Sequence, residues 1–472
     1  MSELFENAVC LAPMVRAGTL PLRLLSLRYG ADLVYSEEII DKRMIATTRV
    51  VNEMLDMIDY TSKNGDSVVF RTCEEEKGRV VFQIGTADPI LALKAAEKVA
   101  HDVAAIDINM GCPKHFSIQG GMGAALLKKP DLACDILKTL RRNLSIPVSC
   151  KIRILDNTAA TIDLAKCLEQ AGAMAIGVHA RQVHERPEDD AHWEALTPIV
   201  SALSVPMLAN GDIFVREDIE KVRQLTGVSS FLIARGALSN ASIFRKEGML
   251  PYTDVVVDYL KAAAETDNVF QNTKYNVGRM LPSKCDAPVD VTNGVPIVTL
   301  PQLGATKSNE QMFALWDLGN YYQQQQDKFR AKAQKLQVAN PRSGMEQQPV
   351  HAYHDGHVLN QQFYCHTCGL QMLSDKDVEL HVKGKKHKKK LRALAAQTVS
   401  EQVARCTAAA TARALQESAQ QPEKPTQPEQ PEQPEQPAKR IKLTDEQQED
   451  SMKAQPSPSD PTAVATTSEP SE

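Results

Sequence analysis

The stretch Ala105-Ile106-Asp107-Ile108-Asn109-Met110-Gly111-Cys112-Pro113-Lys114 begins as a short apolar run and ends in a polar loop that contains glycine. A short apolar run bounded by turn residues is typical of a buried strand. Eight such runs lie between residues 1 and 245: 9–14, 32–36, 80–84, 105–110, 148–154, 175–179, 206–210 and 231–235. Intervening segments, such as 89–100, 159–170 and 216–225, place apolar residues three and four positions apart, as amphipathic helices do. Eight strand–helix units predict an α/β fold of the TIM (β/α)₈ barrel class.

A doubly wound open sheet is the alternative that the same alternation of strands and helices allows. The usual signature of that fold is a G-x-G-x-x-G turn directly after the first strand. Here the first run leads into Ala12-Pro13-Met14 instead. We therefore expect the closed barrel.

The composition narrows the class of protein. A chain of 472 residues with 43% hydrophobic residues can bury one large core and still leave a hundred or so residues for appendages. The formal net charge of −5 argues against a uniformly basic nucleic-acid binder, so any such binding must use local patches. The ten cysteines are irregularly spaced, which predicts reduced thiols rather than a disulfide framework. No signal-like start and no run of about 18 apolar residues is present, so we expect an intracellular protein without membrane contact.

The remaining chain divides by composition. Residues 1–245 form the predicted barrel, and 246–337 form a small helical domain interrupted near 281–308 by a Pro-, Val- and Thr-rich loop. Residues 338–360 are a predicted linker, 361–392 a zinc finger, and 393–472 a disordered tail with Pro-Glu-Gln repeats. Helical patterns are strongest over 251–280 and 311–336.

Polar and reactive residues follow successive predicted strands, at the end of a barrel where active sites lie. They are Gln83, Asn109, Lys151, Arg153, His179 and Arg181, followed by Asn210-Gly211-Asp212 and Ala234-Arg235-Gly236. Taken alone, Lys151 could equally be a solvated residue at a strand end, and His179 could equally be a hydrogen-bonded histidine of the core, rather than active-site residues. Their joint placement after neighbouring strands favours an active site.

The loops after the last two strands predict a phosphate site, which barrels commonly build there. Small residues in these loops let backbone N–H groups approach an anion, Arg235 adds a guanidinium, and a short helix expected near Asn240 would direct its positive end inward. These observations imply a phosphate-bearing cofactor, and they do not distinguish a flavin from a sugar phosphate.

Five segments carry a specific family resemblance: LAPM at 11–14, FQIG at 82–85, DINMGCPK at 107–114, GGMGAALL at 120–127 and VHAR at 178–181. Together they resemble the tRNA-dihydrouridine synthases, over roughly residues 7–280. The stretch 12–23, the segment Tyr35–Glu38 and Lys151-Ile152-Arg153 are further similar to the eukaryotic type 2 branch, which modifies position 20 of the tRNA D-loop.

The resemblance implies a bound FMN that NADPH reduces, hydride transfer from flavin N5 to C6 of a uracil, and Cys112 as the general acid at C5. Without its neighbours, Cys112 would more often be an ordinary buried thiol. Carried over onto matching positions, the predicted FMN contacts are Pro13, Met14, Gln83, Lys151, His179, Asn210, Gly211, Asp212, Ala234, Arg235 and Gly236. Asn109 and Arg181 are expected to face the uracil or its phosphate.

A second motif lies where animal members of that branch often carry a double-stranded RNA-binding domain, for which we find no αβββα pattern. Cys365, Cys368, His381 and His387 have the spacing C-x₂-C-x₁₂-H-x₅-H, which predicts a structural zinc site. Seven Lys and Arg residues and no acid lie within 383–392, a charge pattern suited to RNA phosphates. A finger that binds protein is the alternative.

Two hypotheses from different classes follow. The first is an FMN- and NADPH-dependent reductase of tRNA uridines that uses the finger as an RNA clamp. The alternative is a non-catalytic RNA-binding protein with the barrel as scaffold, and a third, weaker one is an FMN barrel acting on a small molecule. We expect the protein in the cytoplasm, and the basic segment 437–443 adds the nucleus as a second expected compartment.

Overall fold

The computed structural model describes residues 2–63, 65, 67–282 and 296–339, and in the finger residues 364–365, 367–368, 370–371, 375–385 and 387–392. The interior of the predicted insertion, most of the predicted linker, and the tail from residue 393 onward lie outside these residues. The basic segment 437–443 therefore also lies outside them.

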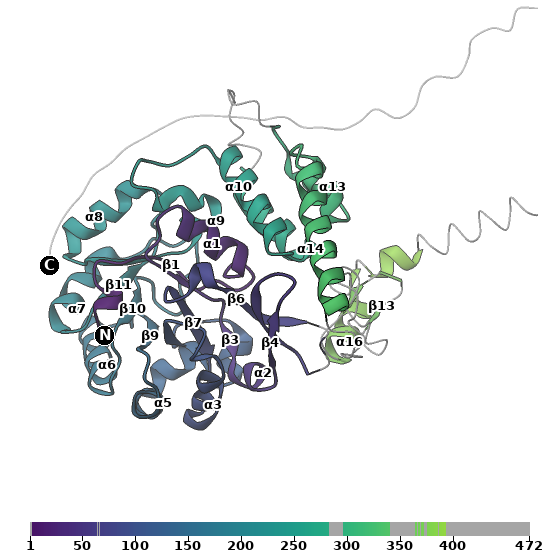
Figure 1. The fold of residues 1–472 in the computed structure, drawn as a ribbon. Helices are drawn as coiled ribbons and strands as arrows, with labels where there is room; N and C mark the ends of the chain where they lie inside the picture. The colour runs from purple at the N-terminus through teal and green to yellow at the C-terminus, as the bar shows by residue number, and fades with distance from the viewer. Residues whose placement is uncertain are drawn as a thin grey trace, which may run out of the picture. The chain divides into compact units, whose positions relative to one another are not determined.

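Eight parallel strands form a closed barrel, which confirms the predicted fold class (Figure 1). The strands are β1 (Val9–Leu11), β2 (Leu33–Tyr35), β7 (Val80–Gly85), β8 (Ala105–Asn109), β9 (Val148–Arg153), β10 (Ile176–His179), β11 (Met207–Asn210) and β12 (Ser230–Ile233). Each strand pairs with the next in this order. Pairing of β1 with both β2 and β12, and of β2 with β7 through Val34 and Val80, closes the ring. A short strand β3 (Ile39–Ile40) extends the contact with β7 near its carboxyl end.

Helices on the outside of the barrel cover the strands (Figure 1). They include α1 (Leu20–Arg28), α3 (Pro89–Val99), α5 (Pro130–Asn143), α6 (Thr158–Gln170), α7 (Leu196–Ala202) and α8 (Arg216–Thr226). Helix α3 shows why such segments form: the Asp88 side chain caps the amides of Ile90 and Leu91, and Pro89 takes the first position, where it sacrifices no helical hydrogen bond. One face of α3, formed by alanines and Val99, is buried against the barrel.

Short helices shape the loops at the carboxyl ends of the strands. They are α2 (Asp41–Ile45), α4 (His115–Gln119) and α9 (Arg235–Ser239). The helix expected near Asn240 is a 3₁₀ turn over Ala241–Phe244, capped by the Asn240 side chain. Because α9 already begins at Arg235, the helix that starts next to the last strand lies five residues earlier than predicted.

A three-stranded antiparallel sheet between β2 and β7 was not predicted. Its strands are β4 (Thr48–Asn52), β5 (Met57–Thr61) and β6 (Val68–Cys73). The polar/apolar alternation of a half-buried sheet is hidden here, because Asp59 points inward and is paired with Arg71 at 2.6 Å. Strand β4 is largely exposed, so its valines give no burial pattern either.

The helical segment after the barrel has more breaks than predicted. The helices are α10 (Tyr252–Glu265), α11 (Phe270–Met280), α12 (Leu300–Ala305), α13 (Asn309–Ala314) and α14 (Gly319–Ala339). The stretch 251–280, predicted as helical, forms two helices that are separated at residues 266–269, where Asp267 takes a left-handed conformation with φ 46°. Helix α12 also lies inside the stretch expected to be a loop, where a Thr299–Gln302 capping box starts it.

In the finger, β13 (Tyr364–Cys365) and β14 (Leu370–Gln371) pair antiparallel, and α16 (Asp375–Lys383) follows them. Among the described residues, no helix has both the length and the apolar character needed to span a membrane.

Candidate active site at the barrel mouth

Two cavities meet at the carboxyl ends of the strands. The first, of about 370 Å³, is lined by Met14, Arg181, the loop after β11 and Arg235. The second, of about 240 Å³, is lined by Pro13, Gln83, Asn109, Cys112 and Lys151, among others. Five residues line both cavities and make them one continuous mouth: Lys114, Arg153, His179, Asn210 and Ala234.

The structure places nearly all predicted site residues in this mouth. Gly236 is the exception, since it lines neither cavity. A Cβ at Gly236 would lie 2.2 Å from the carbonyl oxygen of Ile213. Gly236 therefore allows α9 to pack closely against the loop after β11, and it shapes the site without facing it.

Asp212 organises the cations of the first cavity. Its carboxylate accepts hydrogen bonds from the guanidinium groups of both Arg181 and Arg235, and from the amide of Ala191 at 2.8 Å. A left-handed turn at Gly211 (φ 128°) and Asp212 (φ 51°) points the carboxylate into this position. Because its oxygens are already occupied by arginines, Asp212 is suited to orient these arginines rather than to contact a phosphate itself.

Arg181 is only 3% exposed. Its Nε donates to the Asp189 carbonyl at 2.7 Å, and a terminal nitrogen lies 3.4 Å from His179 Nε2. A guanidinium held on this many sides has little freedom to follow a substrate. In this structure Arg181 forms part of the cavity wall.

A hydrogen-bonded chain connects the barrel floor to the Cys112 loop. The buried Asp107 accepts from Ser149 Oγ at 2.6 Å and from Gln83 Nε2 at 2.8 Å. Gln83 Oε1 accepts from Asn109 Nδ2 at 3.2 Å, and Asn109 Oδ1 accepts from the amides of Gly111 and Cys112, both at 3.0 Å. Asn109 therefore fixes the loop that carries the thiol. Burial raises the pKa of Asp107 to about 6, against the opposing effect of these hydrogen bonds and of Lys151.

Cations crowd the mouth and repel one another. Burial, together with the charge of Arg153, lowers the pKa of Lys151 to about 8. Burial also lowers the pKa of His179 far below its ordinary range, reinforced by Lys151, Arg153, Arg181 and Arg235. Arg153, which the sequence placed at the mouth without a specific role, donates to the carbonyls of Gly111 at 3.0 Å and Gln182 at 2.8 Å.

The charge balance of the mouth favours an anionic ligand. Of the described residues that line the first cavity, five are Lys or Arg (Lys114, Arg153, Arg181, Arg186 and Arg235) and one, Asp212, is acidic. An anion would relieve this repulsion. The cavity volume lies at the lower end of the roughly 300–1,000 Å³ typical of small-molecule sites. These residues therefore fit a phosphorylated cofactor of moderate size, as FMN is.

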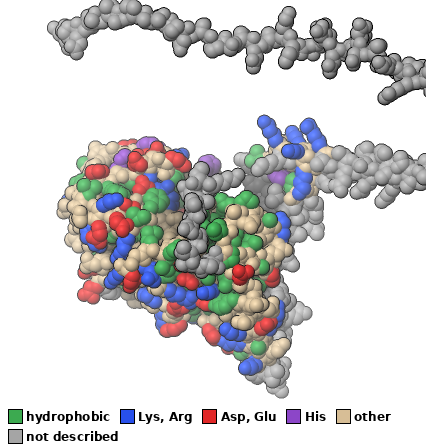
Figure 2. All heavy atoms as spheres, turned by 90° about the horizontal axis from the view of Figure 1, so that it is seen from above, with side chains coloured by type: hydrophobic (Ala, Val, Ile, Leu, Met, Phe, Trp, Pro, Cys, Tyr) green, Lys and Arg blue, Asp and Glu red, His purple; other side chains and the backbone are tan. Residues whose placement is uncertain are grey.

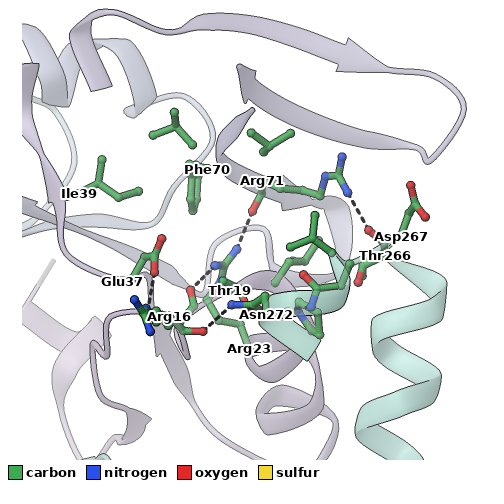
Figure 3. Close-up of a pocket in the computed structure, with 17 residues that line it drawn as sticks. Arg16, Thr19, Arg23, Glu37, Ile39, Phe70, Arg71, Thr266, Asp267 and Asn272 are labelled. Atoms are coloured by element: carbon green, nitrogen blue, oxygen red, sulfur yellow. Dashed lines mark hydrogen bonds between the residues drawn. The ribbon is translucent and has the colours of Figure 1, made fainter. Parts of the chain in front are cut away.

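A third cavity, of about 260 Å³, lies where the helical segment meets the barrel (Figure 3). Arg71 donates to the Thr266 carbonyl at 2.7 Å, and Thr19 Oγ1 donates to Asn272 Oδ1 at 2.9 Å. Asn272 Nδ2 in turn donates to the carbonyl of Arg16 at 2.7 Å. Because Arg16 follows directly on the mouth residues Met14 and Val15, these bonds tie the helical segment to the wall of the site.

The four residues that the sequence proposes as zinc ligands lie close together. The ligand atoms of Cys365, Cys368, His381 and His387 all lie within 4.8 Å of one another. Zinc with Zn–S and Zn–N bonds of about 2.3 and 2.0 Å needs ligand atoms about this close. The donor set therefore fits a tetrahedral zinc ion.

Two family models match this chain, one over the barrel and one over the finger. The family model described as dihydrouridine synthase (Dus) matches residues 10–282, which are the barrel and the first two helices of the helical segment. The chain belongs to this family. A further family model, described as zinc-finger double-stranded RNA-binding, matches residues 362–388.

This chain is similar to proteins that are named tRNA-dihydrouridine synthases. It is 44% identical over 287 residues to the tRNA-dihydrouridine(20) synthase [NAD(P)+] of Schizosaccharomyces pombe, with 59% of this chain and 60% of that protein covered. It is 37% identical over 319 residues to the Saccharomyces cerevisiae protein of the same name, with 61% and 83% covered. A human tRNA-dihydrouridine(20a/20b) synthase [NAD(P)+]-like protein is 33% identical, with 51% and 73% covered. The chain thus spans three fifths of the length of the fission-yeast relative.

Proposed function

We propose that this protein reduces uridine 20 in the D-loop of tRNA to 5,6-dihydrouridine, with FMN as the bound cofactor and NADPH as the reductant. The observation that carries the proposal is the mouth itself, where the thiol of Cys112 and the cations suited to a flavin phosphate line one continuous cavity. The names of the two yeast relatives support the choice of tRNA and of position 20.

The residues of the mouth divide the work of holding FMN. Arg235 and the backbone of the 210–212 turn would hold the phosphate, with Asp212 keeping the guanidinium in place. Met14, Gln83, Lys151 and His179 would surround the ring system, where the charge of Lys151 favours electron-rich forms of the ring. When bound, the flavin supplies the hydride for C6 of the uracil.

Cys112 performs the proton step. Its thiol holds the proton that C5 of the uracil needs, and the Asn109 side-chain oxygen fixes the loop by accepting hydrogen bonds from the backbone amides of Gly111 and Cys112. Burial raises the pKa of this thiol above its ordinary value, so the acid form persists at neutral pH.

The finger is proposed to add affinity for the RNA. Lys383, Lys385, Lys388, Lys389, Lys390 and Arg392 are exposed along its carboxyl-terminal stretch, where Figure 2 shows a gathering of basic side chains. Phosphate contacts of this kind make binding dependent on salt, with a slope that grows with the number of contacts. Replacing three of these lysines with Glu should weaken tRNA binding and flatten its salt dependence, while reduction of the flavin by NADPH stays unchanged.

The decisive test is dihydrouridine content, measured by mass spectrometry after unmodified tRNA is incubated with the full-length protein, FMN and NADPH. We expect product at position 20 with the parent protein and a loss of about 100-fold or more with Cys112→Ala, the scale on which general acids act. Cys73→Ala, at a half-buried thiol outside the mouth, is the matched control and should retain activity. A flavin-loaded parent protein that yields no dihydrouridine in any tRNA would favour the scaffold alternative.

A further inference from the structure

The surroundings of the Cys112 thiol present a conflict for a proton donor. Lys114 from its own loop, and Lys151 and Arg153 from β9, place three cations around it. Positive neighbours stabilise a thiolate, and a thiolate has no proton to give. The cation-rich mouth that suits an anionic cofactor therefore works against the acid form of Cys112.

One acid stands on the thiol side of this mouth. Glu38, in the segment between β2 and β3, lines the second cavity together with Cys112 and Lys114, and it is the single Asp or Glu among the described residues that do so. The remaining titratable neighbour is His179 from β10, and the hydroxyl of Ser117 from α4 lies beside the thiol. The negative charge of Glu38 raises the pKa of Cys112, whereas the positive charge of Lys114 lowers it.

The fold makes room for this carboxyl group. Gly85, the last residue of β7, has no side chain, and a Cβ there would lie 2.6 Å from Glu38 Oε1 and 3.2 Å from its Cγ. Glu38 Oε1 is buried and accepts no hydrogen bond from the described residues, while the carboxyl group as a whole interacts with the Cys112 thiol. Burial raises the pKa of Glu38, and this interaction and the charge of Lys114 act against the rise. A buried carboxylate oxygen without a partner is costly to the fold, so its retention beside the reactive thiol points to a role in the chemistry.

We infer that Glu38 is a positioning residue that keeps Cys112 in its protonated, proton-donating form. This inference rests on the proposed function for its consequence, although the pairing of the two groups does not. The Glu38 carboxylate opposes the three cations, so the thiol keeps its proton until C5 of the uracil takes it. The thiolate left behind then lies next to a carboxylate, and the mutual repulsion favours its return to the thiol by uptake of one proton from water.

The first experiment follows the thiol alone. Alkylation of Cys112 by iodoacetamide is measured against pH in the full-length protein, and peptide-resolved mass spectrometry separates Cys112 from the other nine cysteines. Since the thiolate is the reacting form, Glu38→Gln should move the midpoint of the profile down by about one pH unit, with about tenfold faster alkylation at neutral pH. Glu37→Gln is the matched control, because that carboxylate points to the Arg16 amide and lines the third cavity.

A second variant displaces the carboxyl group without removing its charge. The Cβ of Gly85→Ala would displace the Glu38 carboxyl group from its position beside Cys112. We therefore expect a smaller downward shift of the alkylation midpoint than with Glu38→Gln. Circular dichroism and flavin absorbance report whether each variant is folded, so Gly85→Ala carries the test if Glu38→Gln is not. Alkylation profiles that coincide with that of the parent in both variants would overturn the inference.

The second experiment concerns the reaction. With Glu38→Gln, the high-pH limb of the kcat profile for tRNA reduction should move down by the same amount as the alkylation midpoint, and activity should recover toward pH 6. An increase in KM with an unmoved pH profile would overturn the inference and make Glu38 a uracil contact. If the parent makes no dihydrouridine while the alkylation shift is present, the proposed function fails and the pairing of Glu38 with Cys112 stands.

Discussion

The cations around His179 should make the stability of the folded protein depend on pH. The imidazole lies in the mouth among Lys151, Arg153, Arg181 and Arg235, and burial together with these charges lowers its pKa far below the ordinary value of 6.5. In the unfolded chain the same histidine binds a proton near pH 6.5. The folded protein therefore takes up one proton fewer at mildly acidic pH, and the contribution of His179 to stability is lost as the pH falls below 6.5.

The magnitude follows from proton linkage. If the folded state binds no proton at His179, the loss is RT ln(1 + 10^(6.5 − pH)), which is about 0.1 kcal/mol at pH 7.5 and about 1.4 kcal/mol at pH 5.5. Other groups add their own pH dependence to the parent protein. The difference between the parent and His179→Gln isolates this histidine.

Urea unfolding of the full-length protein at pH 7.5, 6.5 and 5.5 gives the comparison. We expect the parent to lose about 1.3 kcal/mol more than His179→Gln between the first and last pH, whatever the offset between the two proteins at pH 7.5. His101→Gln, at an exposed position after α3, controls for removal of an imidazole elsewhere. Parallel pH dependence of the parent and His179→Gln would refute the picture of a cation-crowded mouth.

Three further predictions concern other parts of the site and barrel. Asp212→Ala should lower the free energy of unfolding by about 3 kcal/mol, because it leaves the buried guanidinium of Arg181 without its carboxylate partner. Differential scanning calorimetry should then show a Tm lower by roughly 6–10 °C. Gly236→Ala should weaken FMN retention, measured by fluorescence titration, because its Cβ would collide with the backbone of the neighbouring loop. Cys134 and Cys167, with sulfur atoms 2.8 Å apart, should form a disulfide under mild oxidation, detected as a loss of two hydrogens by peptide mass spectrometry.

Each of these three predictions has a control or a result that would contradict it. Gly304→Ala is the control for the glycine variant, since a Cβ there meets no atom within 4 Å, and it should leave FMN binding unchanged. A Tm for Asp212→Ala within 1–2 °C of the parent would show that Arg181 is stable without its partner. Closing the 33-residue separation between the two cysteines should stabilise the oxidised protein by up to about 3–4 kcal/mol, and a lower Tm after oxidation would contradict this.

The barrel could be predicted because each strand is buried and reads as a compact apolar run. Residues 105–109 and 148–153 are examples, since nearly every side chain along them lies inside. The β4–β6 sheet could not be predicted in this way. Its one buried carboxylate, Asp59, interrupts the apolar pattern, and only the three-dimensional fold shows that Arg71 compensates it.

The functional site, too, could be predicted only in part from the sequence. The ends of successive strands indicated which residues reach the mouth, because parallel strands in a barrel all end on one side. The partners of those residues were not predictable, since Asp212 reaches an arginine 31 positions away and another 23 positions away through contacts that have no sequence signature. Glu38 belonged to a segment with a family resemblance, yet no sequence pattern revealed that Gly85 makes room for its carboxyl group.

The two acids of the mouth resolve an electrostatic conflict between two requirements. An anionic cofactor needs cations, whereas a thiol that must donate a proton needs protection from them. Asp212 is bound to two arginines on the phosphate side and fixes their direction. Glu38 lies at the other end, on the thiol side, where it opposes the lysines and Arg153. Because each acid acts mainly within its own cavity, the fold can combine a cation-rich seat for the cofactor with a protonated Cys112 in one continuous site.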